Sequence, residues 1–405
     1  MAPSELAPSA DEGPIPVIDV APFRSAADPA SDAGARAVAR AMGAAFEHAG
    51  FVVIVGHGLP PELGEKLYGL SAQFHDLPDE VKADVDHYIP YGDENVSQLI
   101  GNMSKPNDLS DRLSIQNARF ANAPPRSEDV ALGRVLPADF SEVPAQGGSV
   151  TGTRVIATNT TVDGKGKMVS GNPREAAAMA ARAKGVTAEE LVPGIQAAGQ
   201  EYFDGVHRVW RLLQRMSEVE LGLPLHYFDD FYPEEWGSGS LRCYPTFPSE
   251  EELEDEQLRF GAHTDSGGLT LLRTDMEGLQ VSVDGTWHDV PVVEGGLVIN
   301  VARLLARWTN DRWTAAIHRV KNDQITTHRK LTLGMFTSPL PTALIEALPT
   351  CVTDEMPAKF EPILAGEHGR QRGLLHVPGE GVNVPEEFWR ESSGLRRQRV
   401  EPARL

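Results

Sequence analysis

The sequence predicts an α+β protein with a mainly β core, flanked by helices and preceded by an α/β region. Between Ser240 and Leu340, short runs rich in β-branched and aromatic residues recur at close spacing with turn residues between them, which is typical of a jelly roll or a barrel. Before residue 120, apolar residues repeat at helical spacing between short strand-like runs. Hydrophobic residues make up 41% of the 405-residue chain, which is enough for a substantial core.

The N-terminal region alternates strands with helices. Residues 1–14 are rich in Pro, Ala and Ser, and we expect them to be disordered. Strand-like runs begin at Ile15 and Phe51. Apolar spacing predicts one helix over 35–50, which ends in a glycine, and another over 60–78, which opens with two prolines.

The middle of the chain changes composition before the strands of the core begin. Residues 121–193 have few large apolar residues, so we interpret them as an insertion, with one helix over 173–184. A long amphipathic helix is predicted over 201–222. The predicted core strands are 241–248, 258–265, 269–275, 278–283, 286–292, 296–301, 316–322 and 330–336. The expected segments are a disordered N-terminus (1–14), an N-terminal region (15–120), the insertion (121–193), a helical connector (194–238), the β core (239–340) and a helix and loop segment (341–405).

Charge and cysteine content exclude several classes of function. The formal net charge is −21, from 58 acidic and 37 basic residues, which argues against nucleic acid or an anionic membrane as the main partner. Two cysteines, Cys243 and Cys351, fit neither a disulfide framework nor a thiolate metal site. The N-terminus has no signal pattern, and no apolar run approaches the length of a membrane span. We therefore expect a cytoplasmic protein.

Two strands of the predicted core carry metal-binding residue types. In GAHTDSGGLTLL, His263 and Asp265 are separated by one residue, so strand alternation places both on one face, about 6–7 Å apart along the backbone. A third ligand is expected from a distant strand, and His288 and His318 both lie in strand-like segments. His318 is favoured because its segment is short and apolar. Two histidines and one carboxylate leave open positions on an octahedral metal, as in non-haem Fe(II) oxygenases.

Motifs on both sides of the insertion resemble the isopenicillin N synthase-like family of Fe(II)/2-oxoglutarate-dependent dioxygenases. IPVIDV and AFEHAGFVVIVGHGLP resemble the family's N-terminal domain, and GAHTDSGGLTLL, EGLQV, GLVINV, LLARWTNDRW and IHRV resemble its catalytic core. The resemblance implies a double-stranded β-helix core, with 2-oxoglutarate and O2 as co-substrates. It also implies a catalytic Fe(II) held by His263, Asp265 and His318, which leaves His288 as a structural or pocket-edge residue.

The expected 2-oxoglutarate pocket departs from the family's pattern. Relatives bind the far carboxylate with an Arg-x-Ser pair on the strand after the last histidine, where this chain has THRKLTLGMF. Alternation puts Lys330 and Thr332 on one face and Arg329 on the other, so the first two are favoured and Arg329 serves only if the strand slips. An ammonium binds a carboxylate as a point charge, without the paired hydrogen bonds of a guanidinium. Tyr244 resembles a tyrosine that reaches the same carboxylate in many relatives.

A second departure is Ala302–Arg303, where relatives usually have Gly-Asp. Arg303 is a candidate anchor for an acidic substrate or for 2-oxoglutarate, and the alternative is a solvated arginine at a helix start. The other candidate substrate contacts are Ser266, Asn102, Arg112 and Arg119.

The resemblance implies hydroxylation, desaturation or cyclisation of a small-molecule metabolite, of the kind found in antibiotic biosynthesis, as 2-oxoglutarate is converted to succinate and CO2. Two alternatives stay open. An oxidase like isopenicillin N synthase would use O2 without 2-oxoglutarate, which the missing Arg-x-Ser pair permits. A binding protein would have kept the fold and lost catalysis, although the intact ligand set argues against it.

Overall fold

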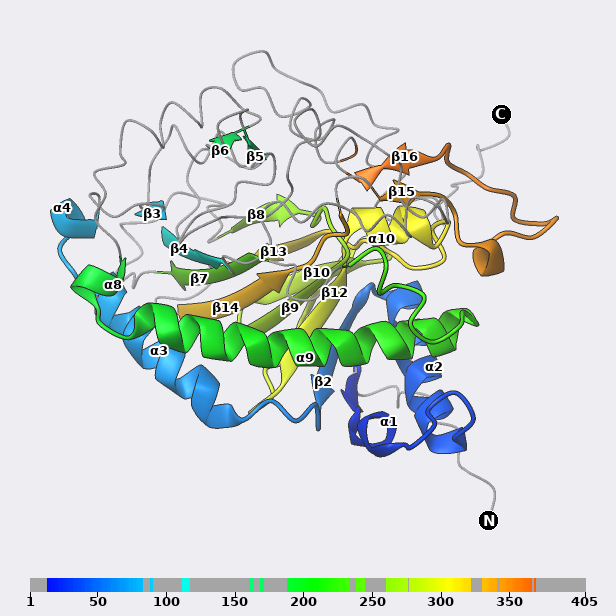
Figure 1. Cartoon of the computed structure of the whole chain (residues 1–405), viewed down its shortest axis with the longest axis horizontal. Coiled ribbons are helices and arrows are strands. Elements are labelled where there is room, and N and C mark those ends of the chain that lie inside the picture. The colour runs from blue at the N-terminus through cyan, green and yellow to red at the C-terminus, as the bar shows by residue number, and fades with distance from the viewer. Residues whose placement is uncertain are drawn as a thin grey trace.

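The centre of the protein is a pair of facing β-sheets (Figure 1). A computed structural model describes residues 13–82, 88–89, 111–116, 160–162, 168–170, 188–232, 238–244, 260–275, 277–321, 330–340, 343–365 and 368. The larger sheet has eight strands in the order β1-β2-β12-β9-β14-β7-β4-β3, and the smaller has four in the order β11-β10-β13-β8. Neighbouring strands in these two sheets are antiparallel, apart from the parallel pair β1 and β2.

All the predicted core strands are present. The larger sheet contains β1 (Val17–Asp19), β2 (Phe51–Val55), β3 (Tyr88–Ile89), β4 (Asp111–Gln116), β7 (Ser238–Tyr244), β9 (Leu269–Thr274), β12 (Leu297–Val301) and β14 (Lys330–Phe336). The smaller contains β8 (Phe260–His263), β10 (Leu279–Val283), β11 (Thr286–Asp289) and β13 (His318–Val320). The two N-terminal strands β1 and β2 extend the larger sheet next to β12.

The helices agree with the apolar spacing except at their ends. The main ones are α2 (Ala33–His48), α3 (Pro61–His75) and α9 (Ile195–Leu221), and the short ones are α1 (Ala21–Ser25), α4 (Asp79–Lys82), α8 (Ala188–Leu191) and α10 (Arg303–Trp308). α9 begins at Ile195 rather than at 201, because its first turns carry small residues that weaken the periodic signal. The helix expected over 173–184 lies outside the described residues.

Several short elements were not predicted. β5 (Thr160–Val162) pairs with β6 (Met168–Ser170), and β15 (Leu344–Ile345) pairs with β16 (Ile363–Leu364) in the segment expected to be helix and loop. A 3-10 turn, Pro349–Cys351, lies between the last two strands. Strands of two or three residues are too short to show the alternation that identifies a strand.

Alternation along the larger sheet creates two apolar cores. Its outer residues, such as Leu271 and Leu333, pack against α2, α3 and α9, and α9 crosses this face in Figure 1. Its inner residues, such as Val298 and Tyr244, pack against Val281 of the smaller sheet. Whatever faces inward from either sheet therefore lies in a largely apolar space between them.

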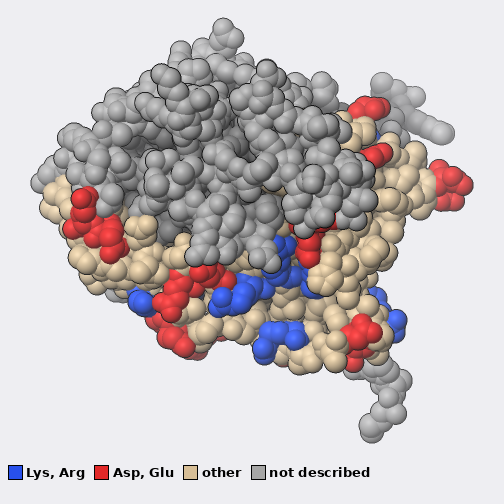
Figure 2. All heavy atoms as spheres, viewed as in Figure 1, with Lys and Arg blue, Asp and Glu red and all other residues tan. Residues whose placement is uncertain are grey.

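Oppositely charged side chains are interspersed on the described part of the face shown in Figure 2. Ion pairs join Lys66 to Glu201 and Arg211 to Asp229. Among the helices that the structure describes, none is both long and apolar enough to cross a bilayer.

Candidate metal centre and co-substrate pocket

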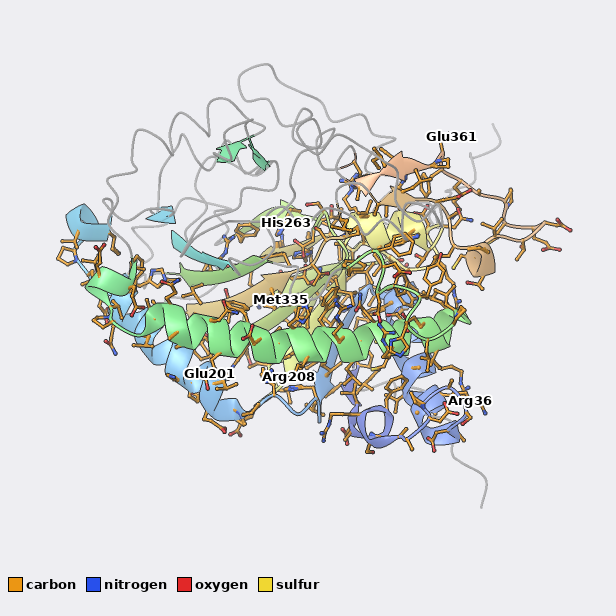
Figure 3. All side chains as sticks on the ribbon, viewed as in Figure 1. Arg36, Glu201, Arg208, His263, Met335 and Glu361 are labelled. Carbon is orange, nitrogen blue, oxygen red and sulfur yellow. The ribbon has the colours of Figure 1, made fainter. Side chains whose placement is uncertain are left out.

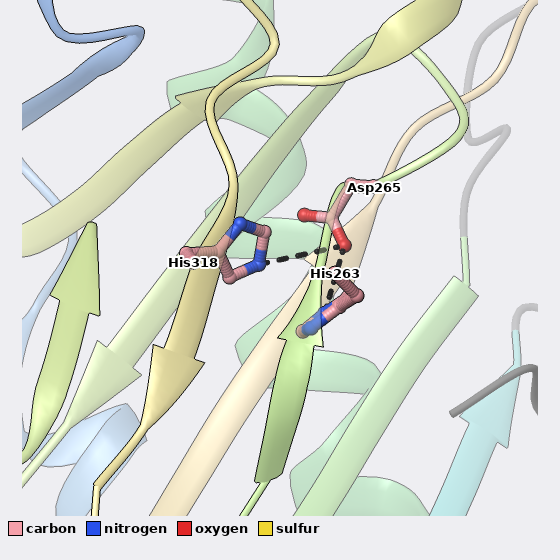
Figure 4. A group of neighbouring side chains, drawn as sticks. All are labelled: His263, Asp265 and His318. Carbon is pink, nitrogen blue, oxygen red and sulfur yellow. Dashed lines mark ion pairs between the residues drawn. The ribbon is translucent and has the colours of Figure 1, made fainter. Parts of the chain in front are cut away.

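Three metal-binding side chains meet at one end of the smaller sheet (Figure 4). His263 ends β8 and His318 begins β13, and the two residues are direct partners in the antiparallel register, with ring centroids 4.2 Å apart. Oδ1 of Asp265 lies 3.7 Å from Nε2 of His263 and 3.8 Å from Nε2 of His318. Within the described part of the chain, this is the one group of three or more His, Cys, Asp or Glu residues with ligand atoms this close together.

The way in which Asp265 reaches the group differs from the prediction. β8 ends at His263, so strand alternation does not carry Asp265 to the same face, and the loop after the strand brings its carboxylate back. His288 faces inward on β11, since its register partner Val281 is also the partner of His318. It lies two strands from His318 and outside the group.

The two oxygens of Asp265 have different partners. Oδ2 accepts hydrogen bonds from Oγ1 of Thr270 (2.6 Å) and Nδ2 of Asn300 (2.8 Å), which are cross-strand partners on β9 and β12. Oδ1 is left facing the imidazoles. Burial alone would raise the pKa of Asp265, but His318, His263 and these two hydrogen bonds together hold it below its usual value. The carboxylate is therefore ionised and oriented, as a ligand must be.

Two neighbouring residues fix the orientation of the His318 ring. Its Nδ1 donates to the carbonyl of Ala316 at 3.2 Å, and Phe51 packs edge-on against its ring. This contact leaves Nε2 as the ring nitrogen that faces Asp265, 3.8 Å from its Oδ1. Two imidazoles and one carboxylate form the donor set of non-haem Fe(II) sites, so these residues fit an Fe(II) ion.

The paired glycines after Asp265 allow the metal-site loop, residues 265–268, to pack tightly. A Cβ on Gly267 would lie 2.1 Å from the carbonyl oxygen of Thr337, and one on Gly268 would lie 2.6 Å from the Tyr232 hydroxyl. The N–H of Gly268 donates to the carbonyl of Thr337 at 2.7 Å. Only glycine fits at this distance from the neighbouring backbone.

The metal-site loop also caps α10, at the place where the chain departs from its relatives. The carbonyls of Asp265, Ser266, Gly267 and Gly268 accept hydrogen bonds from backbone N–H groups of residues 302–305. The N-cap Ala302 makes no side-chain cap, and these carbonyls satisfy the N–H groups instead. Arg303 is only 6% exposed, so the alternative that it is a solvated arginine at a helix start is wrong.

Lys330 and Thr332 face inward beside Tyr244. Lys330 is opposite Tyr244 in the register, and Thr332 follows on the same face. The Lys330 side chain is 1% exposed, its Nζ donates to the carbonyl of Glu277 at 2.8 Å, and it lies 5.9 Å from the Tyr244 ring centre. The alternate residues Leu333 and Met335 belong to the outer core. A buried ammonium among inward-facing residues is suited to hold a carboxylate.

The remaining candidates are less fully described. Ser266 is half-buried in the metal-site loop. Arg112 lies on β4, where its register partner is Arg242 of β7. Asn102, Arg119 and Arg329 lie outside the described residues.

Sequence reasoning missed two polar residues of the inner face, Thr270 and Asn300. Each interrupts an apolar strand at an inward position, in LTLLRT and LVINV. That pattern was the available signal, because a polar residue facing an apolar core needs a partner there.

Replacing Gly267 with Ala is expected to lower the free energy of unfolding by about 1–3 kcal/mol, because the new methyl group overlaps the Thr337 carbonyl. It should also weaken Co(II) binding, since the loop carries Asp265. Gly69→Ala in α3 is the matched control. Its Cβ meets nothing within 4 Å, and a helical Gly-to-Ala change stabilises by up to about 1 kcal/mol. Urea unfolding of both variants measures the two changes in the free energy of unfolding, which should have opposite signs. Equal stability of the two variants would contradict the tight packing of Gly267 against Thr337.

Thr270→Val is expected to weaken Co(II) or Fe(II) binding about 10- to 100-fold, because Asp265 loses one of its two orienting hydrogen bonds. Calorimetric titration of the metal-free protein measures this without turnover. Thr274→Val, on the same face of β9 and opposite Thr332, should bind metal like the wild type. Equal affinity in both variants would show that Thr270 does not orient the ligand.

Comparisons with known proteins agree with this geometry. Residues 15–132 match the family described as non-haem dioxygenase in morphine synthesis N-terminal, and residues 236–339 match the 2OG-Fe(II) oxygenase superfamily. The 2-oxoglutarate-Fe(II) type oxidoreductase hxnY of Emericella nidulans is 27% identical over 356 residues, covering 86% of each chain. The 2-oxoglutarate-dependent dioxygenase citB of Monascus ruber is 25% identical over 319 residues, covering 77% of this chain and 81% of citB.

A solved structure shares the fold. A full-length Neurospora crassa protein, crystallised in complex with alpha-KG, superposes with a TM-score of 0.65 at 24% identity, covering 89% of this chain and 96% of that protein. The expectations drawn from the motifs are thus confirmed at the level of family and enzyme class: the chain belongs to the 2-oxoglutarate–Fe(II) oxygenase superfamily, within which it fits the isopenicillin N synthase-like group.

Proposed function

We propose that His263, Asp265 and His318 hold the Fe(II) of this oxygenase, and that Lys330 and Thr332 hold the far carboxylate of 2-oxoglutarate. The observation that carries the proposal is the convergence of one carboxylate oxygen and two imidazole Nε2 atoms from two distant segments of the chain. Oδ1 of Asp265 lies within 3.8 Å of each Nε2. Iron with 2-oxoglutarate and O2 supplies the oxidation of a substrate C–H bond, as the oxoacid becomes succinate and CO2.

The protein's own groups orient the reactants and exclude water. Thr270 and Asn300 fix the rotation of the Asp265 carboxylate, and Ala316 fixes the tautomer of His318. The Lys330 ammonium faces the inner core, where a carboxylate interacts with it more strongly than in water. Pre-positioning of this kind is the main contribution that a protein makes to cofactor chemistry.

The two sheets are interpreted as the walls of a double-stranded β-helix, with the N-terminal strands β1 and β2 added at the edge of one wall.

A small-molecule substrate is supported by the same Neurospora crassa protein, which was also crystallised in complex with alpha-KG and thymine. The acidic net charge of −21 argues against nucleic acid and anionic membranes as partners. A cytoplasmic location is supported by Cys243 and Cys351, which are buried thiols.

Two alternatives are disfavoured. Relatives named for their use of 2-oxoglutarate argue against the oxidase. The convergence of His263, Asp265 and His318 argues against a binding protein that has lost catalysis. Measuring the ratio of succinate formed to O2 consumed tests the function directly. The proposal predicts one-to-one formation that depends on Fe(II), and its loss in His318→Ala. O2 consumption without added oxoacid would support the oxidase, and the absence of any Fe(II) binding would support the binding protein.

Lys330→Met is expected to raise the KM for 2-oxoglutarate about 30- to 100-fold, because a buried carboxylate loses a charge-assisted hydrogen bond. The control is Lys321→Met, since the Lys321 ammonium pairs with Asp289 at 3.1 Å and should leave the KM unchanged. Thermal unfolding verifies that both variants are folded. An unchanged KM in Lys330→Met would place the carboxylate elsewhere.

A further inference from the structure

Phe260, at the start of β8, lies against the metal-binding residue His263, and the proposed function gives it no role. The centres of the two rings are 4.4 Å apart, and the rings meet edge to face at 78°. The second histidine has a similar neighbour, because the Phe51 ring lies 5.2 Å from that of His318 at 66°. Edge-to-face contact is a preferred arrangement of flat rings, so each phenylalanine favours one orientation of its imidazole.

A β-bulge turns Phe260 towards the metal centre. Phe260 and His263 are three residues apart, so in a regular strand their side chains would point to opposite faces. In the pair with β13, His263 is the register partner of His318. Phe260, however, is the partner of Val320, so three positions along β8 match two along β13. The extra residue places both side chains on the inner face, and bulges commonly re-aim a side chain beside a functional site in this way.

The Phe260 ring also contacts Arg242, a residue of β7. The guanidinium carbon of Arg242 lies 4.1 Å from the centre of the ring, which is the geometry of a favourable cation–π contact. β7 belongs to the larger sheet and β8 to the smaller. Phe260 therefore connects a residue of the facing sheet to the imidazole of His263.

Of the two histidines, His263 is the one that the protein encloses less. Its side chain is 25% exposed, whereas that of His318 is 9% exposed. A side chain that can adopt several rotamers loses conformational entropy when it binds a metal. A neighbour that already restricts the ring reduces this loss, and it strengthens metal binding without touching the metal.

We propose that Phe260 is a positioning residue for His263, and that Arg242 holds Phe260 in place through the cation–π contact. The proposal rests on the proposed function, because it assumes that His263 is a metal ligand. The bulge in β8 is then the feature of the fold that brings Phe260 to this ligand. Phe260 and Arg242 accordingly affect both the affinity for the metal and the geometry of its ligands.

The test is a titration of the metal-free full chain with Co(II), followed by calorimetry and by the visible absorption bands of Co(II), which depend on ligand geometry. Phe260→Leu is expected to weaken Co(II) binding about tenfold and to change these bands, because the flat ring against His263 is lost. Phe260→Tyr keeps the ring and should retain most of the affinity and the wild-type bands. No 2-oxoglutarate is added, so contacts of Arg242 with the co-substrate do not enter the measurement.

Phe74→Leu is the matched control. Phe74 of α3 packs edge to face against His75, with ring centres 5.3 Å apart, and it is buried in the outer core. Figure 3 shows α3 and His263 on opposite sides of the larger sheet. This variant loses the same kind of contact at a histidine outside the metal centre. It should lower the Tm and leave Co(II) affinity and the absorption bands unchanged.

A double-mutant cycle tests the role of Arg242. Arg242→Gln alone is expected to weaken Co(II) binding about threefold, as for the loss of one cation–π contact. In the Phe260→Leu background it should have little further effect, because Arg242 acts through the ring that is already gone. Thermal unfolding verifies that each variant is folded.

Three results would overturn the proposal. The first is wild-type Co(II) affinity and wild-type bands in Phe260→Leu, and the second is an equal loss of affinity in Phe74→Leu. The third is a full effect of Arg242→Gln in the Phe260→Leu background. If Phe260→Leu does not fold, Arg242→Gln decides, and an unchanged affinity in that variant overturns the proposal. Failure of the wild type to bind Co(II) would instead contradict the proposed function, which is a distinguishable outcome.

Discussion

The orientation of the Asp265 carboxylate is the constraint on which the rest of the site depends. One oxygen is held by Thr270 and Asn300 of the larger sheet, and the other faces the two histidines of the smaller sheet. The residue thereby connects the two sheets across their interior. A change in their separation or register would turn the carboxylate away from the imidazoles, so the packing of the inner core and the geometry of the metal centre are coupled.

The same loop explains why the fold tolerates the departures from its relatives. Carbonyls of the metal-site loop accept the first N–H groups of α10, so Ala302 is sufficient at the N-cap. Gly267 and Gly268 are needed because the loop lies against Thr337 and Tyr232. On β14, Lys330 replaces the expected arginine but keeps an inward, buried position next to Tyr244. The charge is retained in the pocket, although the paired hydrogen bonds of a guanidinium are not.

The sequence predicted the features of the fold that depend on a local pattern of apolar and polar residues. Alternation and turn spacing identified the core strands, and helical periodicity identified α2, α3 and α9. The family motifs identified the three residues that the structure brings together. The orienting contacts of Thr270 and Asn300 were missed because they depend on which strands are neighbours, and cross-strand partners leave no trace in the spacing of one segment. The burial of Arg303 could not be predicted, because a charged residue at a helix start gives no sign of what covers it. β15 and β16 were missed because two residues carry no periodicity.

An anaerobic crystal structure with Fe(II) and 2-oxoglutarate is the most direct test of this account. We predict one ion bound by Nε2 of His263, Oδ1 of Asp265 and Nε2 of His318, with the far carboxylate of the oxoacid against the Lys330 ammonium. An ion that leaves His318 uncoordinated, or an oxoacid whose far carboxylate lies away from Lys330, would contradict it.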